Sequence, residues 1–247
     1  MLELRNVSKH FGGVAATDDV TLEIERGEVH ALIGPNGAGK TTLVAQVSGM
    51  LPTDSGRIVF EGEDITALRA YARVRAGLAR SYQVTSLFRR SSVLENLALA
   101  VQARSGSSFS FWRPVAAETV LADEARTLAE EVGLSEKIDV VSARLAHGDQ
   151  RALEVGLALA TRPRLLLLDE PMAGMGPQES RRMIELIERL RERMTILLVE
   201  HDMDAVFRLA SRISVLVNGR VIASGAPAAI RADPLVRQAY LGEDLAA

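Results

Sequence analysis

The chain has 247 residues, with 29 basic and 32 acidic side chains, a formal net charge of -3 and no cysteine. The lack of cysteine excludes disulfide bonds, thiolate metal ligands and cysteine nucleophiles. The small negative charge offers no general attraction to phosphate backbones, so we expect no nucleic-acid partner. At this length we expect one domain that spans residues 1–247.

The first sixty residues predict an antiparallel β flank. Three short segments there alternate partly between apolar and polar residues and are separated by turn residues, as in a sheet with one solvated face. The segments are residues 2–7, 20–25 and 57–61.

Four further segments predict buried strands of a parallel sheet, because each is brief and apolar without polar alternation. They are Val29–Ile33, Leu165–Asp169, residues 195–200 and residues 213–217. Amphipathic helical segments, of which residues 178–193 have well-spaced charges, alternate with these strands. This alternation indicates an α/β fold with a largely parallel sheet.

A helical block interrupts this pattern. Residues 93–132 have helical periodicity, with a break rich in Gly, Ser and Pro at residues 105–114. We therefore expect an α/β core with its β flank from residues 1–84 and 156–247, and an inserted α-helical subdomain over about residues 85–155. No stretch approaches the ~20 apolar residues of a membrane helix, and the N-terminus lacks the apolar core of a secretory signal. A cytoplasmic location is expected.

A phosphate-binding motif follows the first buried strand. Residues 34–42 have the sequence GPNGAGKTT, which matches G-x-x-x-x-G-K-[ST] between a strand and a helical segment. Glycines let backbone N–H groups surround phosphate oxygens, Lys40 reaches the β and γ phosphates, and Thr41 offers its hydroxyl to Mg²⁺. The nucleotide contacts predicted in this loop are Gly34, Asn36, Gly37, Ala38, Gly39, Lys40, Thr41 and Thr42.

Polar side chains end three other predicted strands. Asp169 and Glu170 end the run LLLLDE, at the sheet edge where ligands bind in open α/β folds. Asp169 is predicted to hold Mg²⁺ through its water shell, and Glu170 to orient or deprotonate an attacking water. His201 follows the strand TILLVE, and Gln83 follows the possible strand at residues 78–82. Taken alone, both residues also fit a structural polar side chain at a strand end.

The segment LAHGDQRALE at residues 145–154 resembles the signature of the ATP-binding cassette family, the ATPase subunits of ABC transporters. The resemblance runs essentially from end to end and implies a P-loop NTPase core that binds ATP and Mg²⁺. It implies that Phe11 stacks on adenine and that Gln83 is the Q-loop glutamine, a contact of nucleotide and metal. It also implies that His201 senses the γ-phosphate, so that the expected catalytic residues are Lys40, Glu170 and His201.

The signature departs from the family pattern at two positions. Ala146 replaces the usual serine, and His147 replaces the first glycine. The remaining contacts are Gly148, Asp149 and the start of the helix predicted at residues 150–160, which can face an anion through backbone N–H groups. We expect Ala146, Gly148 and Asp149 to contact nucleotide. Gly176 stands where the family usually has the D-loop aspartate.

The forms LAxGDQ, EPMAGMGP, VEHDM and AYLGED look like the branched-chain amino acid importer branch of this family. The resemblance implies an energy-coupling ATPase that sits peripherally on the inner face of the cell membrane. Its partners would be transmembrane permease subunits, a second ABC ATPase chain in a homo- or heterodimer, and indirectly a solute-binding receptor. Two cassettes would pair head to tail, each signature closing the phosphate loop of the other chain.

A basic stretch offers a candidate surface for the permease. Residues 65–94 contain six arginines and no acidic residue, and Leu87 and Phe88 lie within them as possible apolar anchors. The arginines are Arg69, Arg73, Arg75, Arg80, Arg89 and Arg90. The alternative is a solvated basic face with two core residues. For Phe109, Phe111 and Trp112, packing against the helical subdomain is favoured over a partner contact.

Three other functions compete with amino acid import. The ending YLGED also resembles the ATPase of lipopolysaccharide export, although the signature and the insertion at residues 105–114 favour import. A soluble cassette ATPase that acts on nucleic acid or ribosomes usually has two cassettes or a long coiled-coil insertion, and this chain has neither. A P-loop kinase would have no use for the signature segment.

Overall fold

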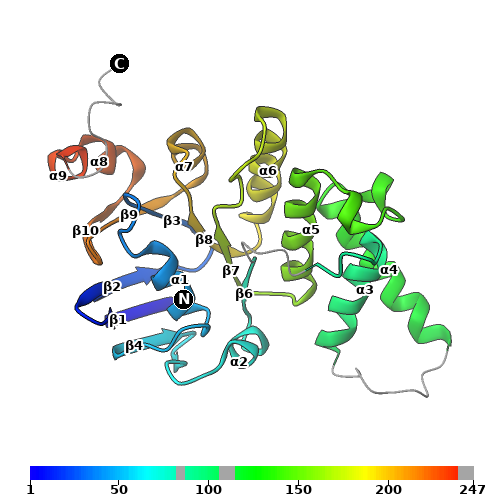
Figure 1. The fold of residues 1–247 in the computed structure, drawn as a ribbon, viewed down its shortest axis with the longest axis horizontal. Coiled ribbons are helices and arrows are strands. Elements are labelled where there is room, and N and C mark those ends of the chain that lie inside the picture. Colours follow the sequence, from blue (N-terminus) through cyan, green and yellow to red (C-terminus); the bar gives the residue numbers. More distant parts are fainter. Residues whose placement is uncertain (82–86, 106–114, 239–247) are drawn as a thin grey trace.

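A computed structural model describes residues 1–81, 87–105 and 115–238 (Figure 1). Within these residues, the strands form two separate sheets. The first is antiparallel, in the order β2 (Val14–Ile24), β1 (Leu2–Phe11), β4 (Ser55–Phe60) and β5 (Glu63–Asp64). The predicted antiparallel flank is confirmed, and its first two strands are longer than the sequence pattern indicated.

The second sheet carries the four strands predicted as buried. Its order is β10 (Arg220–Gly225), β9 (Arg212–Val217), β3 (Val29–Ile33), β8 (Thr195–Val199), β7 (Leu165–Asp169) and β6 (Leu78–Arg80). All neighbours are parallel except β10 and β9. The predicted α/β fold with a mainly parallel sheet is therefore confirmed.

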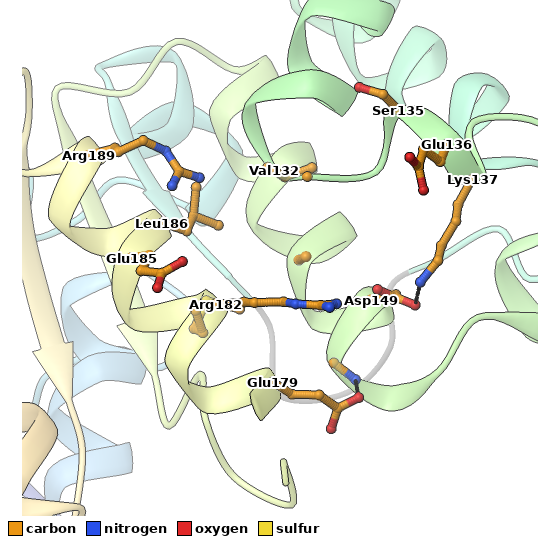
Figure 2. A pocket seen from close by; sticks show the side chains of 14 residues that line it. Val132, Ser135, Glu136, Lys137, Asp149, Glu179, Arg182, Glu185, Leu186 and Arg189 are labelled. Atoms are coloured by element: carbon orange, nitrogen blue, oxygen red, sulfur yellow. Dashed lines mark hydrogen bonds and ion pairs between the residues drawn. The ribbon is translucent and has the colours of Figure 1, made fainter. Parts of the chain in front are cut away.

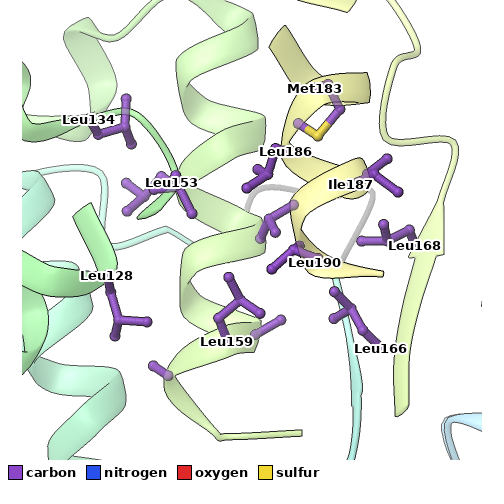
Figure 3. Close-up of a cluster of buried hydrophobic side chains, with 14 of the residues drawn as sticks. Leu128, Leu134, Leu153, Leu159, Leu166, Leu168, Met183, Leu186, Ile187 and Leu190 are labelled. Carbon is purple, nitrogen blue, oxygen red and sulfur yellow. The ribbon is translucent and has the colours of Figure 1, made fainter. Parts of the chain in front are cut away.

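Strand β7 separates two hydrophobic cores. Leu165 and Leu167 pack in the core between the two sheets, whereas Leu166 and Leu168 pack in the core beneath the helices. This division follows from the two-residue period of a strand, and it explains why β7 is apolar at every position. Figure 3 shows Leu166 and Leu168 facing leucines of α5 (His147–Ala160) and α6 (Pro177–Leu190).

The helices pack around the two sheets (Figure 1). The helical subdomain contains α3 (Val93–Arg104), α4 (Val115–Glu131), the short helices η1 (Ser135–Lys137) and η2 (Ser142–Arg144), and α5. Besides α6, the remaining described helices are α1 (Lys40–Val47), α2 (Ala70–Arg75), α7 (Met203–Leu209), α8 (Pro227–Ala232) and α9 (Pro234–Val236). Ser92 and Glu95 form a capping box at the start of α3, which fixes its first turn.

Two helices differ from their predicted limits. Helix α5 begins at His147, three residues earlier than predicted, so the signature glycine lies in its first turn. Helix α6 runs from Pro177 to Leu190 and ends before residues 191–193, which form a turn. Proline at the first helical position lacks only an N–H that would be unpaired there, so it favours this start.

The basic stretch at residues 65–94 is not one continuous surface, which corrects part of the docking prediction. Arg73 is buried, and its guanidinium donates to the carbonyl oxygens of Gln46 (2.7 Å) and Val47 (2.8 Å) at the end of α1. Burial lowers the pKa of Arg73 to about 10. Leu87 is also buried, within the core of the helical subdomain, so it is unavailable as an anchor.

Candidate nucleotide site

The phosphate loop connects β3 to α1 and fits tightly between neighbouring strands. Gly39 immediately precedes α1 with φ +103°, in the left-handed region that favours glycine. A Cβ on Gly39 would lie 2.0 Å from the carbonyl oxygen of Ala16, and one on Gly34 would lie 2.1 Å from that of Leu216. No side chain fits at either position. The strand–loop–helix context predicted for the motif is therefore present.

The other loop residues line up at the start of α1. Asn36 and Gly37 are exposed, whereas Ala38 is buried and its carbonyl oxygen accepts from the N–H of Gly219 (2.9 Å). Thr41 and Thr42 lie in the first turn of α1, with Thr41 exposed. Backbone N–H groups at a helix start favour an anion, and a hydroxyl beside them is an oxygen ligand of the kind that Mg²⁺ prefers.

Lys40 brings positive charge to this loop. Its ammonium donates to the carbonyl oxygens of Gly34 (2.6 Å) and Pro35 (3.1 Å), so the side chain lies along the loop. Burial lowers the pKa of Lys40, and the nearby carboxylates of Glu170 and Asp169 oppose this change by raising it. The structure therefore brings together the three charged residues predicted from two motifs about 130 residues apart.

Asp169 ends β7 as a buried carboxylate with one oxygen unused. Its Oδ2 accepts from Nη2 of Arg80 at 2.7 Å. Its Oδ1 is buried and has no hydrogen-bond partner among the described residues. Burial raises the pKa of Asp169, and Arg80 opposes that rise. An orphaned carboxylate oxygen near the phosphate loop fits a hard cation such as Mg²⁺.

The donor set fits a metal that arrives with nucleotide. In the described part of the chain, no group of three or more His, Asp or Glu side chains gathers as a metal cage. Mg²⁺ is commonly held by one or two protein oxygens together with substrate phosphates and water. Asp169 and the Thr41 hydroxyl are the protein groups that would hold it.

Glu170 adopts a strained backbone conformation directly after β7. Its φ is +47°, which is uncommon for a residue with a side chain, and its N–H donates to the carbonyl oxygen of Val199 at 2.8 Å. Such conformations persist where surrounding structure fixes them, and they cluster at active sites. The hydrogen bond to β8 fixes this one, and the catalytic role of Glu170 stays a prediction.

His201 follows β8, beside a carboxylate that the sequence analysis overlooked. Its side chain is 61% exposed, and its N–H donates to Oε2 of Glu200 (3.1 Å). Glu200 is buried, and its Oε1 accepts from the N–H of Met172 (3.0 Å). Burial raises the pKa of Glu200, opposed by these N–H groups. Glu200 thus joins the end of β8 to the loop that follows Glu170. Its place at the end of an apolar strand was the available signal.

Phe11 ends β1 and is 53% exposed. The ammonium of Lys9 lies 5.7 Å from the ring centroid. An exposed aromatic ring with a cation nearby suits stacking on a purine, so the adenine contact predicted for Phe11 remains our proposal. Gln83, Phe109, Phe111 and Trp112 lie outside the described residues.

The signature segment contacts α6 and η1, as Figure 2 shows. Ala146 precedes α5 without a side-chain cap, and the N–H of Gly148 donates instead to Oε1 of Glu179 at 3.3 Å. The other oxygen of Glu179 accepts from the N–H of Gly176 at 3.1 Å. One carboxylate therefore caps the starts of both α5 and α6. A Cβ on Gly148 would lie 2.8 Å from that carboxyl group, so a side chain there would displace Glu179 from its capping position.

Two further contacts hold the signature in place. Nε2 of His147 lies 3.1 Å from the carbonyl oxygen of Ala173, and Asp149 forms an ion pair with Lys137. The contacts of His147 and Gly148 thus link the signature to the segment around Gly176 within one chain. A pocket of about 560 Å³ lies beside these residues, between η1, α5 and α6, and none of its lining residues belongs to the phosphate loop (Figure 2).

We expect Glu179→Ala to lower the free energy of unfolding by about 1–2 kcal/mol, because loss of a helix cap costs about 0.5–2 kcal/mol. Urea denaturation of the purified chain measures this change. Glu185→Ala is the control, since Glu185 is exposed on the same helix away from both helix starts. Equal losses in the two variants would contradict the double cap.

Comparisons with known proteins identify the family of the chain. The family model described as "ABC transporter" matches residues 17–173, and one described as "Branched-chain amino acid ATP-binding cassette transporter" matches residues 220–246. The chain is 38% identical to the high-affinity branched-chain amino acid transport ATP-binding protein LivG of Salmonella typhimurium and to its counterpart BraF of Pseudomonas aeruginosa. It is 36% identical to the lipopolysaccharide export ATP-binding protein LptB of Escherichia coli. Each of these similarities covers 98% of both chains.

Solved structures of ATP-binding cassettes also resemble this chain over nearly its whole length. The chain is similar to the crystal structure of the ADP conformation of MJ1267, an ATP-binding cassette of an ABC transporter, with a TM-score of 0.85 and 30% identity. That match covers 98% of this chain and 99% of the other. A nucleotide-free cassette of an ABC transporter matches with a TM-score of 0.83 and 28% identity over the same shares. This chain therefore belongs to the ABC transporter family as an ATP-binding protein of the branched-chain amino acid type.

Proposed function

We propose that the chain is the ATP-hydrolysing, energy-coupling subunit of an importer for branched-chain amino acids. The observation that carries the ATPase chemistry is that Lys40 lies near enough to Asp169 and Glu170, at the carboxyl edge of the parallel sheet, for their charges to act on it. The full-length similarity to LivG and BraF supports the solute class. No described helix is long and apolar enough to cross a membrane.

In this proposal the phosphate loop binds ATP through its backbone N–H groups and Lys40. Mg²⁺, when bound through Asp169 and Thr41, would offset charge on the phosphates. Glu170 orients the attacking water, and His201 lies at the next strand end, where it can sense the γ-phosphate. Catalysis of this kind is mainly positioning and electrostatic stabilisation.

A second cassette would complete the site. Among the described residues, the hydrogen bonds and ion pairs of Ala146, Gly148 and Asp149 run to α5, α6 and η1 and not to the phosphate loop of the same chain. We therefore propose that these three residues face the nucleotide held by a partner chain. ATP would then favour the closed pair through contacts that exist only in that state. Each chain would supply one phosphate loop and one signature.

The permease is proposed to dock on the exposed part of the basic stretch. Phe88 is 60% exposed, and Arg89 and Arg90 beside it are exposed. An exposed aromatic ring next to arginines is a common anchor composition in interfaces. Docking there would hold the chain peripherally on the inner face of the membrane, where anionic lipids favour basic residues. A solute-binding receptor would act only through the permease.

We expect Phe88→Asp to reduce the amount of permease that co-purifies with the chain by about tenfold or more, because loss of an interface anchor costs at least about 2 kcal/mol. ATP binding by the isolated chain should not change. Val120→Asp is the control, since Val120 is 64% exposed on α4. Unchanged recovery of the permease with Phe88→Asp would remove Phe88 from the interface.

The whole proposal is tested by purifying the tagged chain from native membranes and identifying its partners by mass spectrometry. Two polytopic membrane proteins and a second cassette are expected. When the complex is reconstituted in liposomes, leucine should be transported only if ATP is present on the side of the membrane where the cassettes lie. Lipopolysaccharide-export components as partners would favour the LptB-like alternative. Recovery of the chain without membrane partners would contradict a transport function.

A further inference from the structure

Arg80 connects three elements of the nucleotide site. It ends β6, and its Nη2 donates to Oδ2 of Asp169 at 2.7 Å. Its Nη1 lies 3.4 Å from the hydroxyl of Ser48, the C-cap residue of the phosphate-loop helix α1. The side chain of Arg80 is only 10% exposed, and that of Asp169 is completely buried. The guanidinium is therefore held between β7 and α1.

This contact determines which oxygen of Asp169 is available. A carboxylate has two oxygens, and Arg80 takes Oδ2 while Oδ1 has no partner in the described residues. Residues that hydrogen-bond a metal ligand fix its orientation, and their loss typically lowers metal affinity by about 10–100-fold. Arg80 occupies this position relative to Asp169.

We propose that Arg80 is a positioning residue that orients Asp169 for the Mg²⁺ bound with ATP. The inference rests on the proposed ATPase function. The positive charge of Arg80 does not oppose this role, because Mg²⁺ arrives with the phosphates of ATP and the complex is negatively charged overall. Arg80 would thus favour binding of the Mg²⁺–ATP complex in two ways, by orienting Asp169 and by its positive charge. The experiment below separates these two effects.

The experiment measures binding of a fluorescent, non-hydrolysable ATP analogue in EDTA and across a Mg²⁺ titration. In Arg80→Ala, we expect the Mg²⁺ concentration that gives half of the maximal increase in analogue binding to rise by about 10–100-fold. The affinity for the analogue in EDTA should change much less. Arg80→Lys, which keeps the charge and one donor group, should recover part of the loss. An equal loss of analogue affinity with and without Mg²⁺ would mean that Arg80 acts only through its positive charge, and it would overturn the proposal.

A double variant tests whether Arg80 acts through Asp169. Arg80→Ala combined with Asp169→Asn should bind Mg²⁺ no more weakly than Asp169→Asn alone, since the two residues form one unit. Additive losses would overturn the proposal. Arg164→Ala is the matched control, because Arg164 bonds a carboxylate of Glu61 (3.0 Å) and lies outside the nucleotide site. Thermal melting verifies that every variant is folded.

The wild-type chain separates the two levels of the proposal. If it binds no nucleotide in either condition, the proposed ATPase function fails. If it binds with the expected Mg²⁺ enhancement and Arg80→Ala behaves identically, only the role of Arg80 fails.

Discussion

Replacing Glu170 by glutamine is expected to lower ATP turnover by about 10²–10⁴-fold, because general-base catalysis by a positioned side chain contributes about that much. Glutamine keeps the size of the side chain and the backbone N–H that bonds Val199. Binding of ATP should remain within about threefold of wild type, since the variant loses an interaction made in the transition state rather than in the ground state. Turnover is measured by phosphate release under saturating ATP, and binding by equilibrium titration.

A control variant separates the chemical role of Glu170 from a structural one. Glu200→Gln alters a buried carboxylate that accepts from the N–H groups of Met172 and His201, so it should mainly reduce stability. Glu170→Gln should leave the melting temperature nearly unchanged. Turnover within a few-fold of wild type in Glu170→Gln would exclude Glu170 as the residue that activates water.

The parts of the proposed site that the sequence could predict come from contiguous motifs. The glycines around Lys40, and the acids that end the apolar run LLLLDE, are adjacent in the chain, so a strand and its end define their positions. Parallel strands then place these ends at one edge of the sheet. The apolar strands could also be predicted from the sequence, because a strand buried on both faces has no polar alternation.

The contacts that were missed join distant segments through ordinary charged residues. Arg80 and Asp169 are 89 positions apart, and Gly148 and Glu179 are 31 apart. In the sequence, Arg80 resembled the surface arginines around it, and Glu179 looked like one more acid on an amphipathic helix. Pairing of this kind depends on how strands and helices pack, which no local pattern contains.

Adjacent residues can also have opposite fates without a local signal. Leu87 and Phe88 were predicted together as anchors, yet Leu87 packs in the helical core and Phe88 is exposed. Both are large and apolar, and they lie before α3 rather than in a helix or strand with a defined period. Without a period, the sequence could not assign either side chain to the core.

The phosphate loop allows a sharp test of its packing. Gly39→Ala is expected to abolish measurable ATP binding and to lower the melting temperature by more than its backbone strain alone would. Alanine in the left-handed region costs about 1–2 kcal/mol, which corresponds to roughly 2–8 °C for a chain of this size. The Cβ would also lie 2.0 Å from the carbonyl oxygen of Ala16, which is backbone of β2 and cannot move like a flexible side chain. The loop, the strand or both must shift.

Two other glycines isolate that clash. Gly37 in the same loop and Gly27 outside it both have φ +79°, and a Cβ on either meets no atom within 4 Å. Gly37→Ala and Gly27→Ala should therefore lose only the strain, as measured by thermal melting, and Gly27→Ala should keep full ATP binding. If Gly39→Ala is no less stable than these two, the packing of the loop against β2 does not require glycine. A larger loss confined to Gly39→Ala would mean that close backbone approach, beyond conformational freedom, dictates the last glycine of the motif.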